Sequence, residues 1–89
     1  MTYHVVITDI AMKKLKKMDR PTAAMILGYI EKNLEGCADP RALGKPLTAN
    51  HRGKWRYRFG DYRIPAMIEE EKIIIAIVDI GHRCDIYDR

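Results

Sequence analysis

The apolar residues in the first part of the chain follow a strand pattern and then a helix pattern. Residues 3–7, YHVVI, form a short run rich in β-branched side chains, which predicts a strand. Thr8 and Asp9 can cap a helix that continues through IAMKKLKKM. The apolar side chains of this segment fall on one side and its lysines on the other. The residues predicted to face the core are Ile10, Ala11, Leu15 and Met18.

A second amphipathic helix is predicted at residues 21–35. The break at residues 19–21 is a turn, and Pro21 is tolerated in the first turn of a helix. Gly36 stands where the end of a helix favours left-handed backbone. Because the connection is so short, the two helices should pack as an antiparallel pair. The apolar stripe of the second helix consists of Ala23, Ile26, Leu27, Ile30 and Leu34.

The second half of the chain changes to a period of two. Residues 37–53 have the composition of a loop, with two prolines and two glycines. Residues 54–59 and 62–69 then predict two strands joined by a tight turn at 60–61. Residues 73–80, IIIAIVDI, are apolar on both faces, so this strand is predicted at the centre of the sheet with cover on both sides.

The order of these elements indicates an α+β fold in a single domain, residues 1–89. An N-terminal strand and a two-helix hairpin precede an antiparallel meander of three strands, and the helices should pack on one face of the sheet. Pro65 falls inside the second meander strand and has no N–H to donate. It therefore predicts a bulge or a local sheet edge at that point.

Length and composition narrow the class of protein. Eighty-nine residues suffice for one domain, and no apolar run approaches the roughly 20 residues that span a bilayer. The N-terminal segment lacks the basic region and cleavage site of a signal peptide, so a cytoplasmic protein without membrane contact is expected. Cys37 and Cys84 do not have a metal-ligand spacing. They are expected to be reduced, although the sequence leaves a disulfide between them open.

The positive charge of the chain is concentrated in one segment. Net charge is +4 overall, but residues 41–63 carry seven Lys or Arg against one Asp, which gives +6. Residues 1–40 contribute +1 and residues 64–89 contribute −3. A local concentration of this kind is typical of a site for a polyanion.

The densest part of this segment is KWRYRFGDYR, residues 54–63. In a strand, neighbouring side chains point to opposite faces, so Lys54, Arg56 and Arg58 should share one face and the intervening aromatic residues the other. Arg63 returns on the next strand, and its face is left open by the turn and by Pro65. Arginine holds phosphate oxygens bidentately, which favours a phosphate-binding surface over a merely solvated strand.

A longer pattern surrounds this stretch. LGKPL (43–47) precedes WRYRFGDYR (55–63), and an apolar strand leads into GHRCDIY (81–87). This combination resembles the RelE/ParE superfamily of bacterial and archaeal toxins, and specifically its RelE-like branch of mRNA interferases. The resemblance covers nearly the whole chain, and its most specific part is the second motif together with the third.

The resemblance implies an activity and a set of partners. RelE-like toxins cut mRNA in the ribosomal A site without a metal, so no cofactor is expected. A co-encoded, RelB-like antitoxin holds them inactive; the expected partners are thus this antitoxin, the ribosome and mRNA. The resemblance places the catalytic residues at Arg56, Arg58, Arg63, Arg83 and Tyr87. His82 is a further candidate for proton transfer, because imidazole titrates near neutrality.

Several other residues are candidates for RNA contact. The loop and strand candidates are Lys45, His51, Arg52 and Lys54, and those of the first predicted helix are Lys13, Lys14 and Lys17. For the helix lysines the alternative is an ordinary solvated face. Trp55 can either stack on a base or pack in the core, and alternation with the arginines favours the core.

Two rival functions remain open at this stage. The ParE branch of the superfamily has the same fold but poisons DNA gyrase and needs no nuclease site. The third interpretation is a catalytically inactive module that binds nucleic acid or an antitoxin. Neither the codon preference nor the antitoxin's identity and binding surface can be deduced from the sequence.

Overall fold

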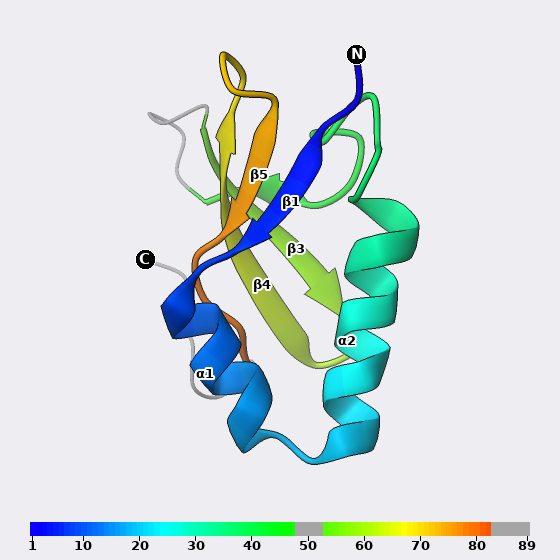
Figure 1. The fold of residues 1–89 in the computed structure, drawn as a ribbon, viewed down its shortest axis with the longest axis vertical. Coiled ribbons are helices and arrows are strands. Elements are labelled where there is room, and N and C mark those ends of the chain that lie inside the picture. Colours follow the sequence, from blue (N-terminus) through cyan, green and yellow to red (C-terminus); the bar gives the residue numbers. More distant parts are fainter. Residues whose placement is uncertain (48–52, 83–89) are drawn as a thin grey trace.

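The computed structural model describes residues 1–47 and 53–82 and confirms the predicted α+β fold (Figure 1). The elements in chain order are β1 (His4–Ile7), α1 (Asp9–Lys17), α2 (Arg20–Asn33), β2 (Lys45–Pro46), β3 (Lys54–Phe59), β4 (Tyr62–Glu69), β5 (Ile74–Ile77) and β6 (Gly81–His82). Two short strands, β2 and β6, add to the predicted set; β2 lies within the segment that was expected to be a loop. Within the described ranges, no helix is long and apolar enough to cross a membrane.

The sheet has the strand order β1-β5-β4-β3-β2. β5 pairs with the C-terminal half of β4, and β6 pairs with the N-terminal end of β4 on the same side. β1 runs parallel to β5, whereas the remaining pairs are antiparallel. β5 is therefore central, as predicted. The expected cover on both of its faces is incomplete: Ile75 and Ile77 are buried, while Ile74 and Ala76 on the other face are only half-buried.

Both helices pack on the same face of the sheet and run in opposite directions (Figure 1). Asp19 caps α2, because its carboxylate accepts hydrogen bonds from the backbone N–H and the hydroxyl of Thr22, at 3.1 and 2.7 Å. Gly36 has φ +79°, as expected after a helix end. Thr8 precedes α1, but its hydroxyl donates to the Ile77 carbonyl of β5 at 2.7 Å, so the predicted side-chain cap does not form.

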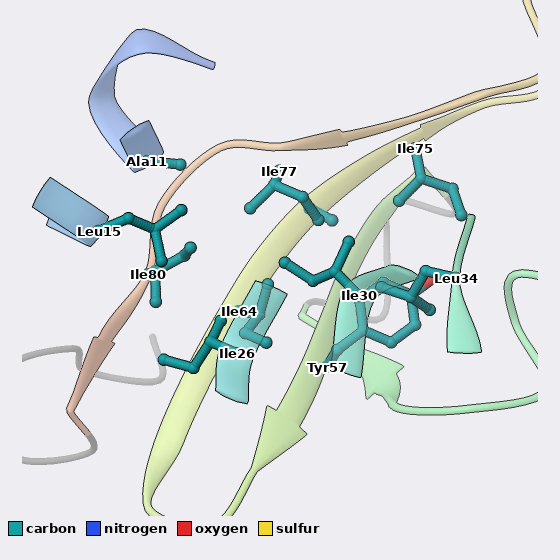
Figure 2. Packing of buried hydrophobic residues seen from close by; sticks show 11 residues of the cluster. Ala11, Leu15, Ile26, Ile30, Leu34, Tyr57, Ile64, Ile75, Ile77 and Ile80 are labelled. Atoms are coloured by element: carbon teal, nitrogen blue, oxygen red, sulfur yellow. The ribbon is translucent and has the colours of Figure 1, made fainter. Parts of the chain in front are cut away.

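The core lies between the helix pair and one face of the sheet (Figure 2). Alternate residues of each strand point into it, because a strand has a period of two. Fully or almost fully buried members are Ala11, Leu15, Ile26, Ile30, Leu34, Tyr57, Ile64, Ala66, Ile75, Ile77 and Ile80. One prediction was wrong: Ile10 is 61% exposed, because α1 turns Ala11 and Leu15 toward the sheet.

Pro65 coincides with a bulge, as its sequence position predicts. Ala66 pairs with Ile77 and Arg63 pairs with Gly81, so two residues of β4 face three residues of the opposite segment. The Pro65 carbonyl accepts from the Val78 N–H at 3.0 Å, which places its missing N–H on the same side. The extra residue of the segment opposite β4 therefore lies where Pro65 has no N–H to donate. On the other side of β4, the pairing with β3 continues through Pro65 without interruption.

Candidate nucleic-acid interface

The β3–β4 hairpin separates cations from aromatic rings as its sequence predicts. Tyr57 is buried, and Trp55 and Phe59 pack against the core. The intervening side chains of β3 leave the opposite face, where Lys54 and Arg58 are exposed and Arg56 is half-buried. Neither α1 nor α2 packs on this outer face of the sheet.

The geometry of the hairpin also determines on which face of the sheet the Arg63 side chain lies. Gly60 has φ +57° and begins a two-residue turn of the type II′ pattern, in which the first central residue is glycine. Phe59 closes the turn against Tyr62, and Arg58 is then the direct partner of Arg63. Directly paired residues share one face of a sheet. Arg63 therefore joins the outer face, the point that the sequence left open.

β2 adds a further cation to the same face. Lys45 is the direct partner of Arg56 across the β2–β3 ladder. Lys45 and Arg56, with Gly44 and Arg58, line a pocket of about 170 Å³. A smaller pocket of about 40 Å³ lies at the hairpin tip between Arg58 and Arg63. The cationic face, as we name it below, consists of Lys45, Lys54, Arg56, Arg58 and Arg63.

Aromatic side chains of β3 hold the neighbouring loop in place. The Trp55 indole N–H donates to the Leu43 carbonyl at 2.6 Å, and the Tyr57 hydroxyl donates to the Pro40 carbonyl at 2.5 Å. Both bonds fix the segment that leads into β2, so they position Lys45 beside Arg56. Trp55 thus has the structural role that alternation favoured.

Arg41 belongs to the basic segment but not to the cationic face. Its guanidinium pairs with the Glu70 carboxylate at 2.9 Å and lies 5.9 Å from the centre of the Trp55 ring. The positive charge of residues 41–63 is therefore used in two ways. Most of it is displayed on the outer sheet face, and one arginine braces the loop.

Burial keeps two groups near this loop protonated. Burial raises the pKa of Tyr57 well above that of an ordinary phenol, so its hydroxyl remains a hydrogen-bond donor in basic solution as well as at neutral pH. Burial also raises the pKa of the Cys37 thiol. Cys37 is a free thiol, as expected, and Cys84 lies outside the described residues.

The structure places His82 on the opposite side of the sheet from Arg56, Arg58 and Arg63. His82 is the direct partner of Tyr62, and the two rings meet edge to face with their centres 5.5 Å apart. Tyr62 packs against the core, so both rings lie on the helix side of the sheet. There they line a groove of about 260 Å³ together with Lys14 and Lys17 of α1. Two of the sequence-predicted lysines thus join His82, while Lys13 is exposed and does not line this groove.

The remaining candidates lie outside the described residues: His51, Arg52, Arg83 and Tyr87. Tyr62 is a residue that the sequence analysis did not single out, although it belongs to the motif GDYR and borders both the hairpin-tip pocket and the groove. Its position directly after the predicted turn at residues 60–61 was the sequence signal that could have identified it as a site residue. Within residues 1–47 and 53–82, no three His, Cys, Asp or Glu side chains gather as a metal site would require.

Comparison with known proteins gives consistent matches over almost the full chain. The family model described as "ParE toxin of type II toxin-antitoxin system, parDE" matches residues 5–87. Toxin RelG of Mycobacterium tuberculosis is 32% identical over 89 residues, which is all of both chains. Toxin RelE of the same organism is 32% identical over 85 residues, covering 96% of this chain and 86% of the relative.

Solved structures match in the same way. The toxin–antitoxin complex RelBE2 of M. tuberculosis contains a chain that superposes with a TM-score of 0.80 at 28% identity, covering 96% of this chain and 95% of that one. The isolated RelE toxin of E. coli gives a TM-score of 0.69 at 15% identity, covering 90% of this chain and 83% of that one. At that identity the second match supports the fold alone.

Proposed function

The chain belongs to the RelE/ParE family of toxins of type II toxin–antitoxin systems, and from this membership we propose that it is a ribosome-dependent endoribonuclease. Its substrate is mRNA in the ribosomal A site, and its effect is to stop translation. The proposal places the protein in the cytoplasm.

One observation carries this proposal: five Lys or Arg side chains share the outer face of β2, β3 and β4 at neighbouring positions of the ladder. Like charges placed opposite one another destabilise a sheet, and arginine is the side chain that binds phosphate in a bidentate manner. A phosphate backbone along this face can contact several of these side chains at once and use that geometry. The relatives named RelG and RelE support assignment to the RNA-cleaving branch.

The chemistry needs no group beyond the RNA, this chain and solvent water. The substrate's 2′-hydroxyl attacks the adjacent phosphorus, a new O–P bond forms, and the bond to the 5′-oxygen breaks. The products are a 2′,3′-cyclic phosphate and a 5′-hydroxyl; the leaving 5′-oxygen takes up a proton from solvent, and Tyr87 later returns to solvent the proton it has taken. Arg56, Arg58 and Arg63 stabilise the negative charge that accumulates at the phosphorus. These arginines form no covalent bond with the substrate.

Proton transfer is assigned to the C-terminal segment. Tyr87 takes the proton of the 2′-hydroxyl, and neighbouring cations favour its phenolate form. The resemblance gives Arg83 the role of a further positive charge in the catalytic set. This assignment follows the family resemblance, since both residues lie outside the described part of the chain. His82 lies on the helix side of the sheet with Lys14 and Lys17, so we assign it no role in proton transfer at the scissile phosphate.

The proposed partner in the resting cell is an antitoxin of the RelB type. The RelBE2 structure of M. tuberculosis is a toxin–antitoxin complex, and its matching chain is 28% identical to this one. An acidic segment that folds on binding would complement the cationic face. Occupying that face would also block RNA.

The family model carries the ParE description, and this favours a second candidate function, inhibition of DNA gyrase. That function needs no nuclease site. The arrangement of cations on one exposed sheet face gives it no particular support, so we place it second.

The deciding experiment maps cuts in a translating reporter mRNA by primer extension after addition of the purified protein. The variants are Arg56→Ala, Arg63→Ala and Tyr87→Phe, each checked for folding by circular dichroism. Lys32→Ala is the matched control, because Lys32 is an exposed cation on α2, away from the outer sheet face. Naked mRNA without ribosomes tests the dependence on translation.

Ribosome-dependent cuts that disappear in the three variants and persist in Lys32→Ala support the nuclease. Intact mRNA together with inhibited gyrase supercoiling would transfer the protein to the second candidate function. Intact mRNA and active gyrase would leave an inactive binding module.

A further inference from the structure

A second basic groove lies on the helix side of the sheet, behind the β3–β4 hairpin. Its walls are formed by Lys14 and Lys17 of α1, by Tyr62 of β4 and by His82 of β6. Met18 and Ile80 give it an apolar part. Segments from both ends of the described chain meet here, so the groove exists only in the folded protein.

The lining combines two kinds of chemistry. Two ammonium groups offer point charges suited to a phosphate. The rings of Tyr62 and His82 meet edge to face at 88°, and both residues are half-buried at the groove. Lys14 lies 3.6 Å from the Asp79 carboxylate, and its side chain is 45% exposed. Ion pairs exposed to this degree are weak, so a phosphate can displace this one.

We infer that this groove binds one nucleotide of the RNA, with a phosphate on Lys14 and Lys17 and a base against Tyr62 and His82. The inference rests on the proposed function, because the nucleotide belongs to the same strand whose scissile phosphate lies on the cationic face. It gives His82 a binding role in place of proton transfer.

Tyr62 connects the two surfaces. It borders the groove, and it also lines the small pocket at the hairpin tip with Arg58 and Arg63. A single strand that leaves the cationic face around the tip therefore passes Tyr62 before it reaches the lysines. Proteins that bind single-stranded RNA combine basic tracks and aromatic platforms in this manner.

The size of the groove favours a nucleotide over a protein segment. Its volume of about 260 Å³ is close to the lower end of the range of roughly 300–1,000 Å³ that is usual for small-ligand pockets. A folded peptide helix needs a longer and more apolar surface. An acidic peptide is nevertheless the competing occupant, and the test includes it.

The test uses the full chain and a short fluorescent oligouridylate, with binding measured by anisotropy over a series of NaCl concentrations. Each phosphate contact with single-stranded nucleic acid contributes about 0.7 to the slope of log K against log salt. Both lysines contact the same phosphate, so the double variant Lys14→Gln/Lys17→Gln should lower the slope by about 0.7. The matched control Lys16→Gln/Lys32→Gln removes the same charge from exposed helix positions outside the groove, and its slope should change little.

The base contact has its own readout. Tyr62→Leu should weaken oligouridylate binding about fivefold or more, the minimum expected when one base loses its stacking partner. In the wild-type protein, the imidazole signals of His82 should shift in NMR spectra on titration with the same oligonucleotide. This second measurement needs no variant and so does not depend on the folding of Tyr62→Leu.

Equal slopes for the two double variants, or unmoved His82 signals, would overturn the inference. Loss of affinity for an acidic antitoxin peptide in Lys14→Gln/Lys17→Gln, with RNA binding intact, would also overturn it and assign the groove to a protein partner. The binding assay contains neither ribosomes nor a cleavage step. The binding assay can therefore be interpreted even if the nuclease assay shows no cleavage. Likewise, failure of the binding assay does not affect the result of the nuclease assay.

Discussion

Arg58 and Arg63 are direct partners across the β3–β4 ladder, and both side chains leave the outer face of the sheet. Directly opposed residues have Cβ atoms about 4.5–5.5 Å apart, and like charges at such positions are destabilising. The Arg58 side chain also donates to the Gly60 carbonyl at 3.4 Å, at the turn that fixes the pairing. The hairpin thus holds two like charges side by side, where one phosphate can contact both.

Replacing Arg58 by Gln should therefore stabilise the protein, because it removes the like charge opposite Arg63, while it reduces RNA cleavage. The expected gain is about 0.2–1 kcal/mol in the free energy of unfolding, measured by urea denaturation at low salt. High salt screens the repulsion and should reduce the gain. Lys54→Gln is the control, because the direct partner of Lys54 is the uncharged Met67. A less stable Arg58→Gln at low salt would contradict the prediction.

Gly44 should be essential for the geometry of the cationic face. Its φ is +75°, and a Cβ atom there would collide with the backbone carbonyl oxygen of Arg56. Gly44→Ala is expected to destabilise the protein by about 1–2 kcal/mol from the left-handed backbone alone, and further through the collision. Displacement of β2 should also reduce RNA binding.

The matched control for this change is Gly28→Ala, and thermal unfolding checks both. Gly28 lies in α2 and is exposed, and a Cβ atom added there would have no atom within 4 Å outside its own helix backbone and chain neighbours. Alanine there should stabilise the helix by about 0.5–1 kcal/mol. Similar unfolding temperatures for the two variants would show that the close approach of Gly44 to β3 does not matter.

Trp55→Leu should separate a structural role of the indole from base stacking, because leucine has neither the indole N–H nor an aromatic ring. The variant loses the hydrogen bond to the Leu43 carbonyl, so the free energy of unfolding should fall by at least about 0.5–1.5 kcal/mol. Its affinity for single-stranded RNA should remain close to that of the wild type, because Trp55 points away from the cationic face. Unchanged stability with weakened RNA binding would instead identify Trp55 as a stacking residue.

Glu35 should make stability fall at acidic pH. Its carboxylate accepts from the Val5 N–H at 3.0 Å and binds the His4 imidazole at 2.9 Å, and these contacts lower its pKa, the first more than the second. A carboxyl group with a lowered pKa in the folded state stabilises the protein above its unfolded-state pKa. That contribution is lost as pH falls through the lowered value.

The wild type should accordingly lose stability relative to Glu35→Gln once pH drops below about 4.5, the ordinary value for this group. Parallel urea titrations from neutral to acidic pH check this. Glutamine keeps an oxygen acceptor for the Val5 N–H, so the difference between the proteins reports the charge. A pH-independent difference would show that the charge of Glu35 has no effect on folding.

Local patterns in the sequence determined much of the fold and part of the candidate site. The period of two at residues 54–59 separates Arg56 and Arg58 from Tyr57, because backbone geometry alone imposes the alternation. Asp19 and Gly36 mark the two ends of α2, because capping depends on residues adjacent in the chain. The position of the hairpin turn is equally local.

Contacts between distant segments were decided only by the tertiary structure. The face of Arg63 depended on the turn at Gly60, and Lys45 reached Arg56 through a two-residue strand within a segment of loop composition. The hydroxyl of Thr8 bonds β5 instead of capping α1, because β1 lies parallel to β5.

His82 illustrates the same limit at the candidate site. In the sequence it adjoins the Arg83 and Tyr87 motif, yet the ladder pairs it with Tyr62 and places it beside lysines from α1. The sequence alone determined which side chains carry charge and how they alternate within each strand. Which of them face one another depends on strand register and helix packing, and these are set by long-range burial of the core rather than by neighbouring residues.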